Sequence, residues 1–300
     1  MKHVLILSDG RMGHLNQSIA FAKTMNYSYD ILDVKFKNKF CKVLSYVFDT
    51  LSIYSKYLLD IGVLQKYTMV IGTGSNTYYA TKVMAKVMGV KSVVMMFPKG
   101  YRLNFDLIFA QSHDNPPKQK NILEIPANFS YVEPKGIYVK EKKKSIGVVI
   151  GGDNSIFKMS EKNLSEQFDF IKTYYKGYAL AITTSPRTST EVEMLVASYD
   201  FDYEVIFSKN PINPIPDFLE QCETVFITAD STSMISEAIS YGKSNVIILP
   251  LESTTKDSEN KFTTFIKTLE KEGYLHIFDG NIQNKNRKID FTQYTKQVQI

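Results

Sequence analysis

Two short apolar segments that run directly into glycine-containing turns constrain the fold of this chain more than any other feature. Residues 3–8 lead into Asp9-Gly10, and residues 145–150 lead into Gly151-Gly152. Further short apolar segments follow each turn, at 29–34, 69–72, 92–97, 107–110, 123–125, 178–183, 203–207, 225–228 and 246–250. Short apolar strands that alternate with helices indicate βαβ units and parallel sheets. We therefore expect two α/β halves of Rossmann type.

Helical periodicity and a run of charges set the expected domain boundaries. Helices are predicted over 13–25, 40–60, 77–88, 161–174, 190–199, 233–241 and 258–273. Residues 140–144 are charged throughout, as is typical of a solvated linker. We therefore expect an N-terminal domain over 1–140, a C-terminal domain over 145–285, and a tail over 286–300 for which a return to the N-terminal domain is one option. A length of 300 residues fits two domains.

Composition excludes several classes of protein. No apolar run approaches the roughly 20 residues that span a bilayer, and the first apolar segment is too short for a signal peptide. The two cysteines, Cys41 and Cys222, form neither a disulfide framework nor a metal-site pattern, so we expect a cytoplasmic protein without a bound metal. The net charge of +5 suits anionic ligands or an anionic membrane, and is too small to indicate nucleic-acid binding.

The turn after the first strand carries the candidate acid–base residues. It enters a helix through glycines, and the amides at a helix N-terminus favour anions. His14 lies at the start of this helix, where it could act as a base, and Asp9 is the rival base. The alternatives are a surface histidine and an aspartate that caps the turn. We assign the acceptor side of a site to residues of this turn and of the turn after strand 69–72: Gly13, Asn16, Gln17, Thr73 and Ser75.

Two strand ends of the second half could contact a diphosphate. The turn Gly151-Gly152-Asp153 would let a diphosphate or a sugar approach the backbone, a feature that is weak evidence when taken alone. The segment with Thr184, Ser185 and Arg187 combines hydroxyls with a planar bidentate donor. A hydroxyl-rich helix cap with a solvated arginine is the alternative for this segment.

A third strand end is the most informative part of the second half. It runs from Asp230 through Ser231, Thr232 and Ser233 into a helix whose first turns carry Glu237. The hydroxyls and amides at this helix start could bind a diphosphate. A carboxylate at position 237 could accept both ribose hydroxyls of a nucleotide.

Taken together, these segments resemble the mitochondrial-fission ELM-type family, a set of GT-B glycosyltransferase-like proteins common in bacteria. The matching segments occur in the family's order over roughly residues 1–275, at 13–17, 183–187, 230–238, 242–243 and 261–262. The first turn is also similar to the glycine-and-histidine loop of the peptidoglycan N-acetylglucosaminyltransferase. The family often has two consecutive basic residues where this chain has Pro186 before a single Arg187, which puts that phosphate contact in doubt.

The resemblance implies a GT-B fold, in which two Rossmann-like parallel-sheet domains face each other across a cleft. It implies that the C-terminal half binds the nucleotide sugar, with Glu237 on the ribose and residues 231–233 near the diphosphate. The N-terminal half would bind the acceptor around His14. We therefore expect a metal-independent glycosyltransferase that uses no cofactor and moves a sugar from a nucleotide-sugar donor to a glycan or lipid-linked acceptor of the cell envelope. Arg187, the hydroxyl-rich turn and helix N-terminal amides would stabilise the leaving diphosphate.

Residues 35–42 interleave lysines with Phe36 and Phe40 ahead of an aromatic-rich helix. Such a segment could rest on an anionic membrane at the inner face of the cytoplasmic membrane, close to a lipid-linked acceptor. An ordinary amphipathic packing helix with a solvated basic end is the alternative.

Two other functions use the same fold. A nucleotide-sugar 2-epimerase has one substrate and no acceptor, and the four histidines of this chain argue mildly against the several acid–base groups it needs. A non-catalytic binding or assembly protein is the other, and the joint presence of His14, Arg187 and Glu237 favours catalysis over it.

Overall fold

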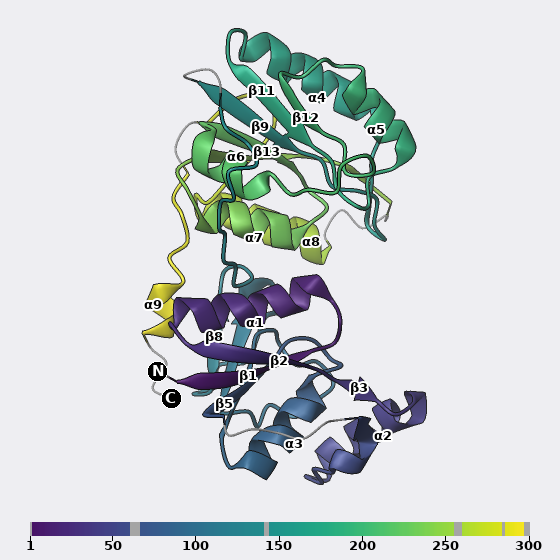
Figure 1. The fold of residues 1–300 in the computed structure, drawn as a ribbon, viewed down its shortest axis with the longest axis vertical. Coiled ribbons are helices and arrows are strands. Elements are labelled where there is room, and N and C mark those ends of the chain that lie inside the picture. The colour runs from purple at the N-terminus through teal and green to yellow at the C-terminus, as the bar shows by residue number, and fades with distance from the viewer. Residues whose placement is uncertain (1, 61–66, 141–143, 255–259, 284–285, 297–300) are drawn as a thin grey trace. The chain divides into compact units, whose positions relative to one another are not determined.

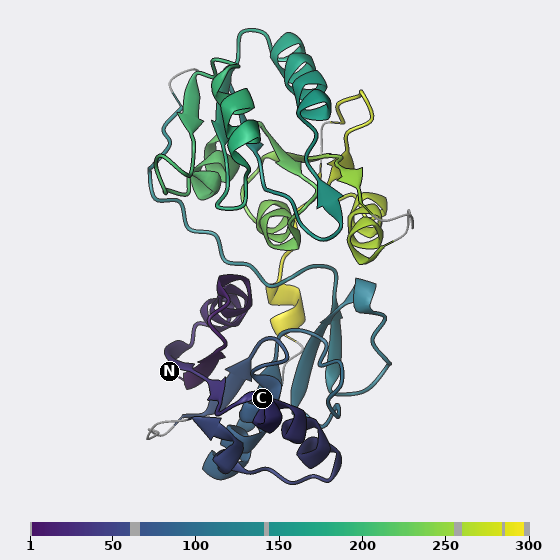
Figure 2. The same cartoon turned by 90° about the vertical axis from the view of Figure 1, so that its right-hand side faces the viewer.

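A computed structural model describes residues 2–60, 67–140, 144–254, 260–283 and 286–296. The chain forms two compact units, the first made of Met1–Tyr131 with Asp290–Ile300 and the second of Val132–Ile289. Figures 1 and 2 show both units. Parts of three predicted segments lie outside the described residues, namely 141–143 of the charged run, 258–259 of the last helix and 297–300 of the tail.

The first unit contains a six-stranded parallel sheet in the order β2-β1-β5-β6-β7-β8. Its strands are β1 (His3–Ser8), β2 (Ser28–Asp33), β5 (Met69–Gly72), β6 (Lys91–Val94), β7 (Leu107–Gln111) and β8 (Ile122–Ile125). Helix α1 (Met12–Thr24) connects β1 to β2, and α3 (Tyr78–Met88) connects β5 to β6 in the opposite direction across the sheet. Right-handed crossovers in opposite directions place these helices on opposite faces, as Figure 1 shows. Strand order therefore reverses between β1 and β5, where open α/β sheets bind ligands.

The second unit repeats this plan with the order β12-β11-β9-β13-β14-β16. Its strands are β9 (Ser145–Val149), β11 (Ala179–Thr183), β12 (Tyr203–Val205), β13 (Thr224–Thr228), β14 (Asn245–Leu249) and β16 (His276–Ile277), all parallel. Its helices are α4 (Glu161–Tyr174), α5 (Thr190–Ala197), α6 (Ile215–Gln221), α7 (Thr232–Ser240) and α8 (Lys261–Lys271). Here α4 leads from β9 to β11 and α7 from β13 to β14, so strand order reverses between β9 and β13.

The predicted helix over 40–60 is too long. Helix α2 (Lys39–Thr50) ends ten residues earlier, and Ser52 follows in a left-handed conformation with φ 60°. The chain then forms a short 3-10 helix, η1 (Lys56–Leu58), and the strand β4 (Leu59–Asp60), which pairs antiparallel with β3 (Lys35–Phe36). The sequence has neither glycine nor proline to mark this helix end, so apolar content alone extended the prediction.

Several short elements were not predicted. The second unit has an antiparallel pair, β10 (Phe157–Lys158) with β15 (Glu252–Ser253), and the first unit has a 3-10 helix η2 (Ser112–Asp114). Helix α6 was missed because proline usually indicates a turn or a break in a helix. A helix tolerates proline in its first turn, which is where α6 has it. None of the described helices is long and apolar enough to cross a membrane.

The chain passes from the first unit to the second after Tyr131, ahead of the predicted boundary at residue 140. The carboxylate of Asp217 fixes this passage, because it accepts backbone hydrogen bonds from four successive residues, 135–138, at 2.9 to 3.3 Å. The chain's last described segment carries α9 (Thr292–Thr295) and belongs to the first unit (Figure 2), where the ring of Phe291 stacks on Phe129 at 4.5 Å.

Candidate functional site

The first candidate site, called the β1 site here, lies where β1 and β5 end. Asp9 follows β1, and both of its carboxylate oxygens lie 3.1 to 3.2 Å from Nδ1 of His14 on α1. The Asp9 side chain is 2% exposed and that of His14 is 20% exposed. The amide of Arg11 also donates to the Asp9 Oδ1 atom, at 3.2 Å. The carboxylate thus holds both the turn and the imidazole.

This arrangement defines the proton on the His14 ring. Because Nδ1 faces the Asp9 carboxylate, a neutral imidazole carries its proton on Nδ1 and presents a lone pair on Nε2. Among the described residues Nε2 has no hydrogen-bond partner. A histidine that is oriented by a carboxylate and has a free Nε2 has the geometry of a general base.

The turn after β5 packs directly against this histidine. Gly74 has φ +88°, and a Cβ atom there would lie 2.4 Å from the His14 ring. Only glycine fits both constraints. The hydroxyl of Thr73 is buried and lies 2.7 Å from that of Ser18, so it joins the turn after β5 to α1.

Lys42 on α2 completes the β1 site and was not among the predicted site residues. Its Nζ donates to the backbone carbonyl of Ser75 and to the hydroxyl of Tyr101, the latter at 3.2 Å. Burial lowers the pKa of Lys42 to about 8, and the nearby charge of Asp9 opposes this shift. The contact joins residues 33 positions apart. No local pattern could have revealed it, because Lys42 stands in a run of lysines that indicates a solvated surface.

The remaining predicted acceptor-side residues occupy the start of α1 and the turn after β5. Gly13, Asn16 and Ser75 are exposed. Gln17 is buried, and its amide nitrogen donates to the carbonyl of Gly13 at 3.2 Å while its Oε1 lacks a partner among the described residues. The structure therefore brings the predicted residues of the first unit together around one pair of strand ends.

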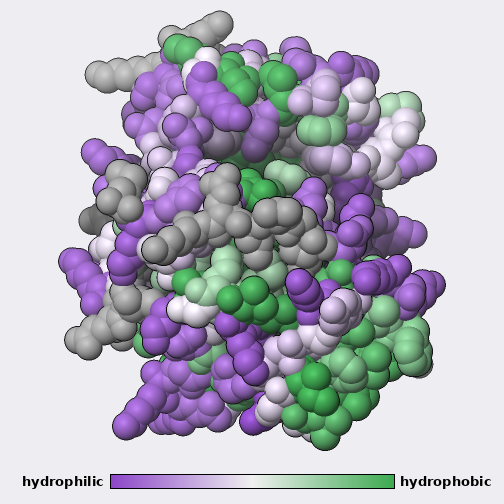
Figure 3. Space-filling model, turned by 60° about the horizontal axis from the view of Figure 1, so that its bottom comes forward, coloured by the Kyte–Doolittle hydropathy of each residue, from purple (hydrophilic) through white to green (hydrophobic). Residues whose placement is uncertain are grey.

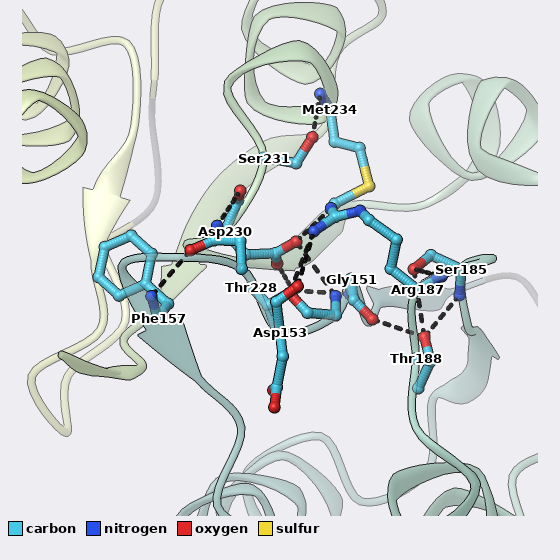
Figure 4. A network of polar contacts seen from close by, with 12 residues as sticks. Gly151, Asp153, Phe157, Ser185, Arg187, Thr188, Thr228, Asp230, Ser231 and Met234 are labelled. Carbon is cyan, nitrogen blue, oxygen red and sulfur yellow. Dashed lines mark hydrogen bonds and ion pairs between the residues drawn. The ribbon is translucent and has the colours of Figure 1, made fainter. Parts of the chain in front are cut away.

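The second candidate site, called the β9 site here, lies where β9, β11 and β13 end. Its centre is the Asp230 carboxylate, which Figure 4 shows pointing toward Arg187. The Nη2 atom of Arg187 lies 2.6 Å from Asp230 Oδ2, and the amide of Gly152 donates to the same oxygen at 3.1 Å. The hydroxyl of Thr228 donates to the other oxygen at 2.7 Å and accepts from the Gly151 amide at 2.8 Å. Asp230 thus ties three strand ends together.

The two glycines of the β9 site were predicted to let a ligand approach the backbone. In the structure the protein itself fills the space on the Cβ side of each glycine. A Cβ atom on Gly151 would lie 2.1 Å from the Asp230 carboxylate, and one on Gly152 would lie 2.1 Å from the carbonyl of Arg187. The hydroxyl of Thr188 further donates to the Gly151 carbonyl at 2.5 Å. The glycines therefore permit close packing of the loop that presents Arg187.

The segment after β11 divides into a buried part and an exposed part. The Thr184 hydroxyl is buried, donates its one hydrogen to Glu193 at 3.2 Å and accepts from the Phe207 amide at 2.8 Å. Ser185 accepts from the amide of Arg187 at 3.2 Å and shapes the turn. The Arg187 side chain is 45% exposed, so part of its guanidinium faces solvent while Asp230 holds the rest.

Asp153 follows the glycines and is also structural in part. Its Oδ1 accepts from the Met159 amide at 2.8 Å, while the residue itself is exposed. The neighbouring Asn154, which was not assigned to the site, donates to the Asp230 carbonyl at 3.0 Å.

The start of α7 presents polar groups next to Asp230. Ser231 is the N-cap, and its hydroxyl accepts from the Met234 amide at 3.4 Å. The Ser233 hydroxyl has no hydrogen-bond partner in the described part of the chain, and Thr232 and Ser233 are both partly exposed. No acidic residue lies in the first turn of α7, and the carboxylate of Asp230, which precedes the N-cap, is paired with Arg187.

Glu237 lies one further turn along α7. Burial raises the pKa of Glu237 to about 7. Its carboxylate makes no hydrogen bond or ion pair within the described residues. A partly buried carboxyl without a partner is costly, which is typical of a group that binds a ligand.

The described residues contain no group of three or more His, Cys, Asp or Glu side chains that could hold a metal ion. The sequence does contain an Asp-x-Asp pattern, Asp200-Phe201-Asp202. It precedes β12 and so lies at the amino ends of the parallel strands, whereas the β9 site lies at their carboxyl ends. Asp202 accepts from the amide of Leu180 at 2.9 Å.

Comparisons with known proteins place this chain among relatives of low identity. The family model described as mitochondrial fission ELM1 matches residues 12–296. The uncharacterized protein RP120 of Rickettsia prowazekii (strain Madrid E) is 24% identical, over 93% of this chain and 91% of that protein.

Among solved structures, the chain is similar to MurG of Acinetobacter baumannii, with 15% identity, 95% of this chain and 87% of that chain covered, and a TM-score of 0.48. It is similar to the glycosyltransferase SnogD from Streptomyces nogalater, with 12% identity, coverage of 95% and 88%, and a TM-score of 0.49. It is also similar to the UDP-GlcNAc 2-epimerase from Neisseria meningitidis bound to UDP-GlcNAc, with 12% identity, coverage of 93% and 95%, and a TM-score of 0.46. The predicted fold class, two Rossmann-like parallel-sheet units of GT-B type in one chain, is confirmed.

Proposed function

The chain belongs to the mitochondrial fission ELM1 family, and from the residues at its two switch points we propose that it is a glycosyltransferase. It would move a sugar from a nucleotide-sugar donor to a hydroxyl of an acceptor. The observation that carries this proposal is the Asp9–His14 pair at the end of β1, in which no described residue bonds to the Nε2 atom of His14. A nucleotide-binding protein without catalysis needs no such base.

In this proposal the β1 site activates the acceptor. His14 Nε2 takes the proton from the acceptor hydroxyl as that oxygen attacks the sugar, and Asp9 stabilises the imidazolium that forms. Lys42 provides a positive charge for an anionic group of the acceptor. Its ammonium is half-buried, and the charge of Asp9 favours its protonated form.

The β9 site would bind the donor. The dipole at the start of α7, the Ser233 hydroxyl and the exposed part of Arg187 stabilise the negative charge that develops on the leaving diphosphate. Since these groups supply positive potential, the transfer we propose requires neither a metal ion nor a cofactor. Glu237 accepts hydrogen bonds from the ribose hydroxyls, which provides the partners that its carboxylate lacks.

We further propose that the acceptor is a glycan or a lipid-linked precursor of the cell envelope. The protein would then act in the cytoplasm, peripherally on the inner face of the membrane. The basic and apolar surface of α2, described below, supports this location.

A turnover assay with a panel of UDP-, dTDP- and GDP-sugars tests the proposal. We expect free nucleoside diphosphate only when glycan or polyprenyl-linked acceptors are present, and its loss in His14→Ala. An isomerised nucleotide sugar without acceptor would identify an epimerase instead. Binding of a nucleotide sugar without any turnover would identify a non-catalytic protein, and full turnover of His14→Ala would remove His14 from the role of base.

A further inference from the structure

Helix α2 exposes a continuous apolar face. Phe40, Val43, Val47 and Leu51 recur at helical spacing and are 71%, 62%, 49% and 62% exposed. Exposed apolar residues continue after the helix at Ile53 (44%) and Tyr57 (76%). We call these six residues the α2 face. It forms part of the hydrophobic surface at the lower right of Figure 3. Exposed apolar groups that gather on one surface, unlike scattered ones, mark interaction sites.

The opposite side of α2 is anchored. Leu44, Tyr46 and Phe48 pack against the core of the first unit, and the ring of Tyr46 stacks on Tyr101 at 4.4 Å. The side chain of Asn38 caps the helix by accepting from the Cys41 amide at 2.9 Å. The apolar face is therefore presented by a helix that the unit holds in place.

The exposed charges within residues 35–57, which carry the α2 face, all have one sign, while the exposed Asp60 lies opposite Lys35 in the β3–β4 pair. Residues 35–57 contain five lysines, at positions 35, 37, 39, 42 and 56, and one acidic residue, Asp49. Asp49 is buried and paired with Lys82 at 2.6 Å. Every exposed charge of the segment is therefore positive. An apolar helix face bordered by lysines is typical of helices that lie in the interface of an anionic membrane.

We propose that the α2 face docks on an anionic lipid surface, with Lys35, Lys37, Lys39 and Lys56 in contact with the headgroups. A second copy of the chain fits this face less well. A two-fold interface would bring the same lysines of both copies together without an exposed acidic residue of the segment to pair with them.

Docking would also position the β1 site. Lys42 lies on the same helix and contacts the carbonyl of Ser75 beside the Asp9–His14 pair. A membrane that holds α2 therefore holds the β1 site next to the headgroup region. The identity of a lipid-linked acceptor rests on the proposed function, whereas docking itself does not.

Vesicle co-sedimentation tests the docking surface without any turnover. Wild-type protein is expected to bind vesicles of phosphatidylcholine and phosphatidylglycerol in equal parts, to bind pure phosphatidylcholine weakly, and to lose binding as salt rises. The double variant Lys37→Gln/Lys39→Gln should lower the partition coefficient about 30-fold, because two charges near the surface are removed. The double variant Phe40→Ser/Val47→Ser should lower it at least about tenfold.

Matched controls distinguish this face from the rest of the surface. Met194 on α5 is 62% exposed and Lys267 on α8 is exposed, and Met194→Ser and Lys267→Gln should bind vesicles as wild type does. Thermal unfolding monitored by circular dichroism identifies any variant that fails to fold. Equal binding by the α2 variants and the controls, or no preference for phosphatidylglycerol, would overturn the proposal. So would a dimer in light scattering that Val47→Asp converts to a monomer. If vesicles bind but no sugar is transferred, the proposed function fails and the docking surface stands.

Discussion

Asp9→Asn provides the sharpest test of the β1 site. The Asp9 side chain is 2% exposed and its Oδ1 accepts from the Arg11 amide, so an asparagine at this position must keep its oxygen there. Its NH₂ group then replaces Oδ2, which lies 3.1 Å from Nδ1 of His14. Because an NH₂ group only donates, it favours an Nδ1 that accepts and a ring proton on Nε2, although the retained Oδ1, 3.2 Å from Nδ1, can still accept. In either tautomer the imidazolium loses the carboxylate charge that stabilises it, so the base is weakened although the shape of the site is kept.

The magnitude follows from the role. A positioned general base contributes about 10²- to 10⁴-fold, which equals about 3 to 5 kcal/mol of activation free energy. We therefore expect kcat of Asp9→Asn to fall by about 10²- to 10⁴-fold with little change in KM. The assay is release of nucleoside diphosphate in the presence of acceptor.

The same strand offers a matched control. At its other end His3 pairs with Asp30 at 3.0 Å, and these side chains are 37% and 46% exposed. Asp30→Asn removes an equivalent His–Asp contact away from the site and should leave kcat unchanged. Nitrogen-15 NMR of the imidazole checks the reasoning without substrate. A neutral His14 with its proton on Nε2 in the wild-type protein would refute it, as would an unchanged kcat in Asp9→Asn.

Three further predictions concern buried groups. Lys82→Met leaves the carboxylate of Asp49 buried without its cation and should lower the free energy of unfolding by about 3 to 5 kcal/mol in urea, whereas Lys91→Met breaks an exposed pair and should cost less than about 1 kcal/mol. Gly151→Ala places a Cβ atom 2.1 Å from a buried carboxylate and should cost about 1 to 3 kcal/mol in the same assay, with weaker nucleotide binding in calorimetry. Burial raises the pKa of Glu237 to about 7, above its ordinary 4.5, so the folded state binds a proton that the unfolded state has released and stability falls as pH rises between these values. Glu237→Gln should therefore raise Tm above pH 7 and leave it unchanged below pH 4.5, and equal effects at both would contradict this assignment.

Sequence patterns predicted the elements that buried strands and regular helices define. The strands 69–72 and 3–8 were predicted within their observed limits, because short continuous apolar runs are typical of strands that a parallel sheet buries on both faces. The helix 161–174 was likewise predicted, since Ser160 caps it and its apolar spacing is regular. The end of α2 was not predicted, because it depends on Ser52 in a left-handed conformation that no residue type announced.

The sequence by itself determined that two Rossmann-like halves occur and that polar residues follow their strands, since both depend on local periodicity and on glycine turns. The tertiary structure alone decided which groups those residues contact. The Cβ side of Gly151, a glycine that was predicted to let a ligand approach, accommodates the carboxylate of Asp230, which follows a strand nearly 80 residues away. Lys42, which belongs to a run of surface lysines, reaches the turn after β5. Contacts between strand ends depend on strand order, and strand order is set by long-range packing that no local pattern contains.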